Sequence, residues 1–397
     1  MATFFLCMIY AAFISLGLPD SLLGAAWPAM QPALGVPLDS AGVLSMIVAG
    51  GTVVASLSAD RMLHRFGTGR VTLVSVTMTA CALLGYALAP GFWWLALAAV
   101  PMGLGAGAVD AGLNNFVALH YEARHMSWLH CFWGVGATLG PVILSLFLGG
   151  KHGWRGGYGA VCAIQFCLVA VLAVTLPMWD RYEDRAALRA EAAAAKQAGK
   201  KQSTLNIPGV KGALATFFFY CAIEAAAGLW GASYLVEARG LSAEAAAWGV
   251  SLYFLGITLG RFLSGFASMR MKSAALIRLG QLVSAGGAVL LMLPLPAGFG
   301  VAAMAVLGLG FAPVCSMIHE TPYRFGAGVP RRSLACRWHA HMWAHICARS
   351  VRRAGRTAGH RSAAGVPAGG RGRNAAACGT RSHAVRAVKG ERHICGL

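Results

Sequence analysis

Charged residues are scarce in this chain of 397 residues. Only 12% of the residues are Asp, Glu, Lys or Arg, and just 14 are acidic, whereas a soluble globular protein has about 25% charged residues. So few charges cannot cover the surface of a water-soluble protein of this length. The composition, with a mean hydropathy of +0.61, therefore excludes an ordinary soluble fold.

Motifs of common enzyme and metal sites are also missing. The sequence has no nucleophile elbow, no P-loop and no Cys-x-x-Cys pair, so we expect neither an enzyme nor a cofactor, and no metal site before residue 326. Seven of the 11 Cys lie singly in or near apolar blocks, where Cys behaves as a small hydrophobic residue. These are Cys7, Cys81, Cys131, Cys162, Cys167, Cys221 and Cys315.

The sequence contains long blocks of apolar residues. A helix needs about 20 apolar residues to cross the bilayer, and ten blocks approach or exceed that length. They predict an all-α polytopic membrane protein in which the first block is a retained helix and not a signal peptide. The blocks are 3–28, 41–59, 71–89, 93–118, 127–149, 155–177, 210–236, 243–268, 273–293 and 298–318.

Basic residues gather in alternate loops. The loop after the second block holds Arg61, Arg65 and Arg70, and the loops after blocks four, six and eight are basic as well. The opposite loops hold only Lys151, Arg155 and Arg239. Because cytoplasmic loops are enriched in Lys and Arg, we expect a cytoplasmic N-terminus and a bacterial inner (plasma) membrane location.

A polar segment divides the apolar blocks into two groups. We expect a six-helix bundle over 1–179, a cytoplasmic linker over 180–209, an incomplete four-helix bundle over 210–325 and a basic tail over 326–397.

Three motifs recur in the same order in both groups. They are Asp20-x3-Gly24-x2-Trp27 with Glu224-x3-Gly228-x-Trp230, Gly50-x-Thr52 with Gly256-x-Thr258, and Gly103-Leu-Gly105 with Gly308-Leu-Gly310. Parallel repeats of this kind predict two pseudo-symmetric bundles.

These motifs resemble those of a known family. The stretch from Ser58-Ala-Asp60-Arg61 to Gly69-Arg70 resembles the loop 2–3 signature of the major facilitator superfamily, and Gly136-x3-Gly140-Pro141 resembles its GxxxGP motif. The resemblance implies a major facilitator fold with twelve helices, of which about ten are recognisable here.

Within that superfamily the sequence resembles the fucose-permease branch most. The resemblance rests on Asp20, on Asp110-Ala-Gly-Leu-Asn114-Asn115-Phe116, and on Met317-Ile-His319-Glu320-Thr-Pro322; Asp110 stands where Glu is usual and Asn115 where Pro is usual. It implies a proton-coupled, sugar symporter-like protein, with a small solute and protons as partners. Apart from the resemblance, we expect a monomer in the lipid bilayer that binds no nucleic acid.

Ionisable residues inside the apolar blocks are the candidate binding groups. Such a group costs about 2.5–3.5 kcal/mol on insertion scales and is a functional hypothesis by default. Asp110 and Asn114 share a helix face and could grip hydroxyl groups and a proton. The alternative role of Asp110 and Asn114 is a polar contact that holds two helices together. The alternative for Asp20 is a structural role in a kink at Pro19-Asp20. The predicted substrate and proton site comprises Asp20, Asp110, Asn114, Asn115, Glu224 and Trp230, although Trp230 could equally be an interfacial anchor.

A second set of residues is predicted to act in gating or packing. Asp60, Arg61 and Arg65 suggest an interhelix charge clasp, with Arg261 as its counterpart in the second half; the alternative is solvated loop charges. His319 and Glu320 are predicted to gate or cap the tenth helix. Gly136, Gly140 and Pro141 are predicted to pack one helix closely against another.

The tail after residue 326 differs from the rest of the chain. It holds 14 Arg and Lys against the single acid Glu391, and six of the 12 His. We interpret it as an out-of-frame reading that replaces helices 11 and 12. The alternatives are a basic tail that binds nucleic acid or anionic lipid, or a metal cluster of His339, His341, His345 and Cys347.

The sequence favours a secondary active transporter for a small polar solute that works by alternating access. Two other functions stay open. One is proton-driven efflux of drugs or metabolites, and the other is a membrane protein without transport activity because helices 11 and 12 are missing.

Overall fold

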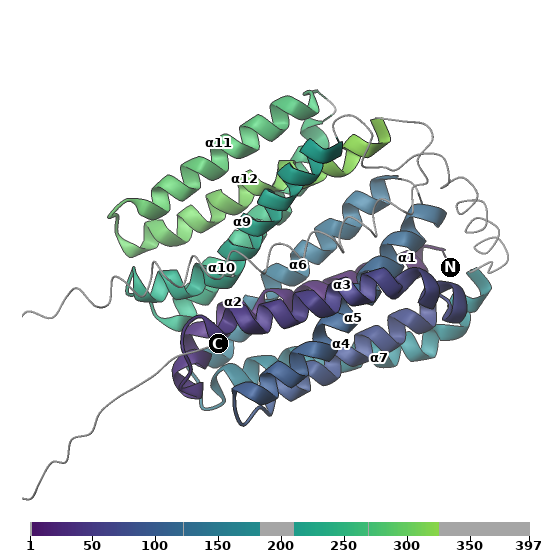
Figure 1. Cartoon of the computed structure of the whole chain (residues 1–397), viewed down its shortest axis with the longest axis horizontal. Coiled ribbons are helices and arrows are strands. Elements are labelled where there is room, and N and C mark those ends of the chain that lie inside the picture. Colours follow the sequence, from purple (N-terminus) through teal and green to yellow (C-terminus); the bar gives the residue numbers. More distant parts are fainter. Residues whose placement is uncertain (1, 122, 183–209, 269, 325–397) are drawn as a thin grey trace, which may run out of the picture. The chain divides into compact units, whose positions relative to one another are not determined.

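The computed structural model describes residues 2–121, 123–182, 210–268 and 270–324. Over these residues the chain is helical, as predicted from its apolar blocks (Figure 1). The helices of the first half are α1 (Ala2–Asp20), α2 (Leu22–Leu34), α3 (Ser40–Phe66), α4 (Thr68–Ala87), α5 (Phe92–His120), α6 (Ala123–Leu148) and α7 (Gly153–Tyr182). Those of the second half are α9 (Val210–Glu237), α10 (Ala243–Ala267), α11 (Ser273–Met292) and α12 (Ala297–Arg324). Nearly all of the predicted linker lies outside the described residues, and so does the whole basic tail.

Nine spans within the described residues are long and apolar enough to cross a membrane. They correspond to the first nine predicted blocks. The tenth block forms α12, whose described apolar stretch, Ala297–Pro313, is shorter than a full membrane crossing. The prediction of an all-α polytopic membrane protein is confirmed.

The first predicted helix is interrupted. It reaches Leu34, beyond its expected end, and Ser21 separates α1 from α2 although the whole span Phe5–Leu34 is apolar. Pro19 precedes the break and has no backbone N–H to bond the carbonyl of Ser15. Gln165 of α7 takes that place, since its Nε2 donates to the Ser15 carbonyl at 2.5 Å and its Oε1 accepts from the Ser15 hydroxyl at 3.0 Å. A polar side chain from a neighbouring helix thus satisfies the backbone at the kink.

Close glycine contacts hold the helices of each half together. In the first half, the backbone of α5 at Gly103 lies directly against the carbonyl of Val48 in α3. In the second half, Gly308 of α12 lies in the same way against the carbonyl of Tyr253 in α10. Because Gly103 and Gly308 occupy matching positions of the repeat, the two halves use the same type of close packing.

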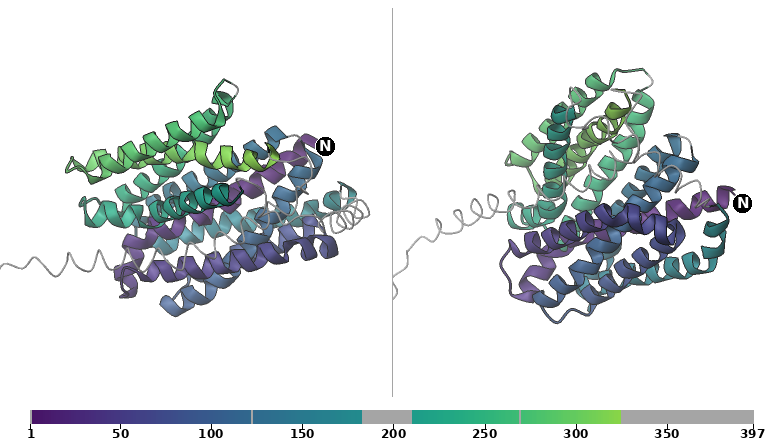
Figure 2. Two further views of the ribbon diagram at one scale, coloured as in Figure 1. Left: turned by 45° about the horizontal axis from the view of Figure 1, so that its top comes forward. Right: turned by 45° about the vertical axis from the view of Figure 1, so that its right-hand side comes forward.

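In the described part of the chain the two halves meet mainly along two pairs of helices. Helix α6 packs against α10, and α2 packs against α9. In both views of Figure 2, the green helices of residues 210–324 lie together on one side of the purple-to-blue helices of the first half. Asp20, at the end of α1, therefore lies close to the boundary between the halves.

Candidate functional site

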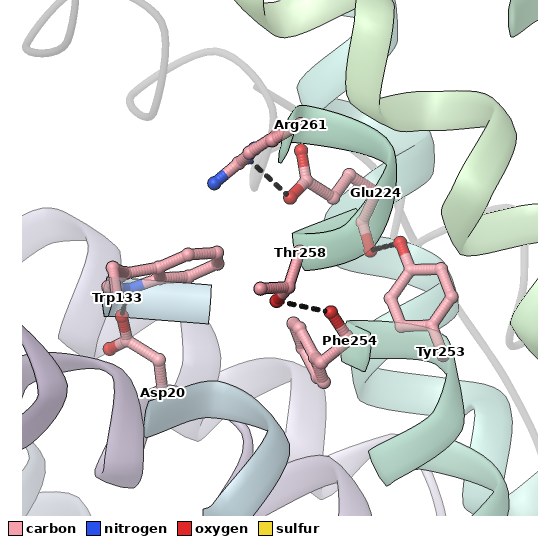
Figure 3. Close-up of polar contacts among 7 residues, drawn as sticks. All are labelled: Asp20, Trp133, Glu224, Tyr253, Phe254, Thr258 and Arg261. Atoms are coloured by element: carbon pink, nitrogen blue, oxygen red, sulfur yellow. Dashed lines mark hydrogen bonds and ion pairs between the residues drawn. The ribbon is translucent and has the colours of Figure 1, made fainter. Parts of the chain in front are cut away.

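Asp20 lies at the break between α1 and α2. Its side chain is exposed although its neighbours Pro19 and Ser21 are buried. The carboxylate Oδ2 accepts a hydrogen bond of 2.8 Å from the indole Nε1–H of Trp133 in α6 (Figure 3). An exposed carboxylate within a membrane-long span is the arrangement expected of a group that meets an ion or a polar solute.

Asp110 and Asn114 meet on one face of α5, as their spacing predicts. Asn114 Nδ2 donates to Asp110 Oδ1 at 2.9 Å and to the Asp110 backbone carbonyl, also at 2.9 Å. The Asp110 carboxylate is close enough to Asp20 for their charges to repel. A like charge nearby disfavours the charged form of a carboxylate.

Glu224 of α9 forms an ion pair with Arg261 of α10. Arg261 Nη2 and Glu224 Oε1 are 3.5 Å apart, and the two side chains are only 9% and 15% exposed. The hydroxyl of Tyr253 donates to the backbone carbonyl of Glu224 at 3.0 Å and ties the two helices at the same level. Opposite charges at this depth offset each other, so neither is left as an uncompensated charge inside the protein.

Trp133 connects these two groups, and the sequence analysis did not identify it. The Arg261 guanidinium carbon lies 5.1 Å from the centroid of its ring, within the range of a cation–π contact. Phe254 of α10 lies nearly perpendicular to the same ring, with 6.2 Å between the ring centroids. A signal was present in the sequence, because Trp133 stands three residues before Gly136 and seven before Gly140, on the face of the glycine motif.

The glycine motif itself lies against α1. A Cβ on Gly136 would overlap the carbonyl oxygen of Ile14, and one on Gly140 would lie 2.5 Å from that of Leu18. Pro141 is buried in the same helix. The close approach of α6 to α1 brings the Trp133 indole within reach of the Asp20 carboxylate.

Three further contacts join the halves around this site. A Cβ on Gly24 of α2 would overlap the carbonyl oxygen of Gly228 in α9, so the matching glycines of the repeat touch each other. The Ser251 hydroxyl of α10 donates to the Thr138 carbonyl of α6 at 2.9 Å. Gly134 of α6 lies directly against Thr258 of α10.

The other predicted binding residues have simpler surroundings. Asn115 is half-buried on α5. Trp230 is half-buried and packs against the hydrophobic core that both halves share. That contact fits the packing alternative for Trp230 as well as a wall of a binding site.

The predicted gating residues are described only in part. Arg61 and Arg65 are exposed near the end of α3, and the Arg65 guanidinium lies 5.3 Å from the ring centroid of its neighbour Phe66. The side chains of Asp60, His319 and Glu320 lie outside the described residues, so the charge clasp and the role at the end of α12 stay predictions.

One apolar pocket lies elsewhere on the molecule. Its volume is about 400 Å³, and it is lined by Leu73, Val74, Thr77, Met78, Cys81 and Pro101 of α4 and α5. Because it contains none of the ionisable groups described above, we do not place a polar solute there.

Comparison with known proteins decides the family. The sequence matches the profile of the Major Facilitator Superfamily over residues 9–325. The chain belongs to the major facilitator superfamily. Its members are membrane transporters, which agrees with the membrane-length helices described above.

Two relatives match about two thirds of the chain. The glucose/mannose transporter GlcP of Bacillus subtilis is 23% identical over 266 residues, which are 66% of this chain and 65% of that transporter. Bypass of stop codon protein 6 of Saccharomyces cerevisiae is 23% identical over 286 residues, 66% of this chain and 56% of that protein. The chain thus spans less than two thirds of the length of either relative.

Solved structures show the same fold. The peptide transporter POT in complex with sulfate has a TM-score of 0.67 and 14% identity, covering 87% of each chain. The xylose transporter XylE from E. coli has a TM-score of 0.64 and 12% identity, covering 86% of this chain and 90% of that one. At such identity the likeness establishes the fold alone.

Proposed function

We propose that this major facilitator transporter moves a small, sugar-like solute by alternating access, coupled to the movement of protons. The site would comprise Asp20, Asp110 and Asn114 from the first half, with Glu224 from the second. Asn115 and Trp230 complete the proposed set. The proposal covers a monomer in the inner membrane of a bacterium, with the N-terminus in the cytoplasm.

The observation that carries the proposal is the Asp20 carboxylate at the break between α1 and α2, with Asp110 of α5 as its electrostatic neighbour. Asp20 is exposed within a membrane-long span, and Asp110 acts on it electrostatically. A carboxylate in such a place is costly while charged, and a second negative charge nearby adds to the cost. Binding one proton removes the cost of the charge and the repulsion between the two carboxylates. Proton binding would in this way be coupled to movement of the solute.

The chemistry of the site supports a hydroxylated solute. Carboxylate oxygens accept hydrogen bonds, and the Asn114 carboxamide both donates and accepts them. The pair therefore offers both roles that a sugar hydroxyl needs. The printed name of the relative GlcP, a glucose/mannose transporter, supports the same class of solute.

The inter-half contacts support one state of the transport cycle. Gly24 with Gly228 and Ser251 with Thr138 close the halves on the side where α2 and α9 end. The basic loops lie at the opposite ends of the helices. If those loops are cytoplasmic, these two contacts lie in the outer half of the membrane.

Replacement of Asp110 by Asn tests the proton role. The purified chain is reconstituted in liposomes, and uptake of radiolabelled glucose is driven by an imposed pH gradient, acid outside. We expect Asp110→Asn to reduce accumulation by about tenfold or more, toward simple equilibration. Glucose counterflow, which needs no net proton movement, should stay within about threefold of wild type. The tenfold figure corresponds to loss of about 1.4 kcal/mol of coupling.

The matched control is Asp39→Asn, which makes the same change at an exposed turn between α2 and α3. It should leave both measurements unchanged. Uptake by the Asp110 variant that still depends on the pH gradient would remove Asp110 from the proton site. A wild-type chain that takes up no glucose would refute the proposed solute.

A further inference from the structure

One side chain at the boundary contacts charged groups from both halves. The Trp133 N–H donates to the Asp20 carboxylate at 2.8 Å. The face of the same ring carries the Arg261 guanidinium, with 5.1 Å from its carbon to the ring centroid. Figure 3 shows the indole lying between these partners, with Glu224 beside Arg261.

These two contacts strengthen each other. A charged carboxylate that accepts a hydrogen bond from an indole makes a charge-assisted bond and increases the electron density of the ring. A more electron-rich ring holds a cation more firmly over its face. When the carboxylate binds a proton, the hydrogen bond becomes an ordinary neutral one, and the attraction between ring and guanidinium falls with it.

We propose that Trp133 is a positioning residue that transmits the protonation of Asp20 to Arg261, and so controls how firmly the two halves are held together. The inference deepens the proposed function, because it rests on Asp20 being a proton-binding group. It adds Trp133 to the proposed mechanism as the side chain that connects the proton-binding carboxylate with the contact between the halves.

Glu224 makes the release of Arg261 possible. Arg261 pairs with Glu224 within the second half at 3.5 Å. When its hold on Trp133 weakens, the guanidinium still has a carboxylate in its own half. The halves can then separate without leaving an uncompensated charge inside the protein.

Other charged or titratable groups surround the relay. Asp110 of α5 acts on Asp20, so its charge favours the protonated state of the relay. Cys131 of α6 and Tyr253 of α10 feel the charge of Arg261. Both side chains are neutral in their protonated forms. The contacts from Asp20 through Trp133 to Arg261 are therefore the ones that involve charged groups.

A double-mutant cycle tests the relay without any transport measurement. Trp133→Leu, Arg261→Gln and the double variant of the full chain are purified in detergent, and their thermal unfolding midpoints are measured at pH 8 and pH 5. The cycle subtracts the separate effects of each change, including the unpairing of Glu224. Trp128→Leu with Arg261→Gln is the control cycle, because Trp128 is an exposed Trp of the same helix.

We expect a non-additive effect of roughly 2–4 °C at pH 8, which becomes clearly smaller at pH 5. In an Asp20→Asn background it should have the smaller value at both pH values, which separates Asp20 from Glu224 as the titrating group. The control cycle should be additive throughout. Additivity at pH 8, or the same coupling at both pH values in the wild-type background, would overturn the proposal.

Transport supplies an independent readout. Trp133→Phe keeps an aromatic ring but has no N–H, so it cannot sense Asp20. We expect it to reduce glucose accumulation driven by a pH gradient by about tenfold, with counterflow within about twofold of wild type and Trp128→Phe unchanged. Unchanged accumulation and an unchanged pH profile in Trp133→Phe would contradict the relay. If the wild-type chain itself accumulates no glucose, the proposed function fails, and the unfolding cycle still decides on the relay.

Discussion

Replacing Gly24 by Ala tests the idea that the described state is one of two. In this structure a Cβ at position 24 would overlap the Gly228 carbonyl oxygen and would lie 2.9 Å from both the Gly228 carbonyl carbon and the Leu229 Cα. Because non-bonded heavy atoms prefer a separation of about 3.5 Å, and the overlap with the carbonyl oxygen is the tightest, the backbones of α2 and α9 would have to move apart by roughly one ångström or more.

The cost follows from the rigidity of the two backbones. Extra volume in a well-packed contact typically costs about 1–3 kcal/mol, which corresponds to a shift of roughly 5- to 150-fold in a two-state equilibrium. The opposite state, in which α2 and α9 are separated, does not bear this cost. We expect Gly24→Ala to populate that state at the expense of the one described here.

Distance measurement by pulsed electron paramagnetic resonance can detect the shift. Nitroxide labels at cysteines introduced for Ala33 and Glu237, both exposed near the ends of α2 and α9, report the separation of the two helices in a background without other reactive cysteines. The distance distribution should move to longer values in Gly24→Ala. Gly50→Ala is the control, since a Cβ there meets nothing within 4 Å. Identical distributions in both variants would refute the reasoning.

Two further predictions concern stability. Arg239 donates to three carbonyls at the end of α11 and just beyond it, where a cation also offsets the helix dipole. Arg239→Ala should therefore cost about 1–2 kcal/mol and lower the unfolding midpoint by roughly 2–8 °C. The control Arg270→Ala, at an exposed turn, should leave the midpoint unchanged. Gln165→Leu leaves the buried Ser15 hydroxyl and carbonyl without their partner and should cost about 1–3 kcal/mol, measured in the same way, with Gln281→Leu on the exposed face of α11 as its control. Equal midpoints for a variant and its control would contradict the role assigned to that side chain.

The helices could be predicted from sequence because the membrane sets their length. Apolar blocks near 20 residues and the repeated Gly103 and Gly308 motifs indicate both the number of helices and the packing within each half. The break at Ser21 could not be located in this way. Hydropathy stays high through Phe5–Leu34, and the partner that makes the break possible, Gln165, is about 150 positions away in the sequence.

The site was predictable only within single helices. Asp110 and Asn114 are four residues apart, so helical geometry alone brings them together. Glu224 and Arg261 were assigned to different roles, because a sequence does not show which residues of two helices lie at the same height. Trp133 was missed since an aromatic residue in an apolar helix is usually part of the core. The role of its indole N–H becomes clear only from the structure, in which α1 packs against α6 at Gly136.

The most direct test of the account is whether glucose moves protons. Wild-type chain is reconstituted in liposomes that contain a pH-sensitive dye, and glucose is added outside with no gradient imposed. Our account predicts acidification of the lumen on glucose addition, and loss of the signal in Asp110→Asn but not in Asp39→Asn. Glucose entry without any pH change would contradict proton coupling through the Asp20 and Asp110 carboxylates.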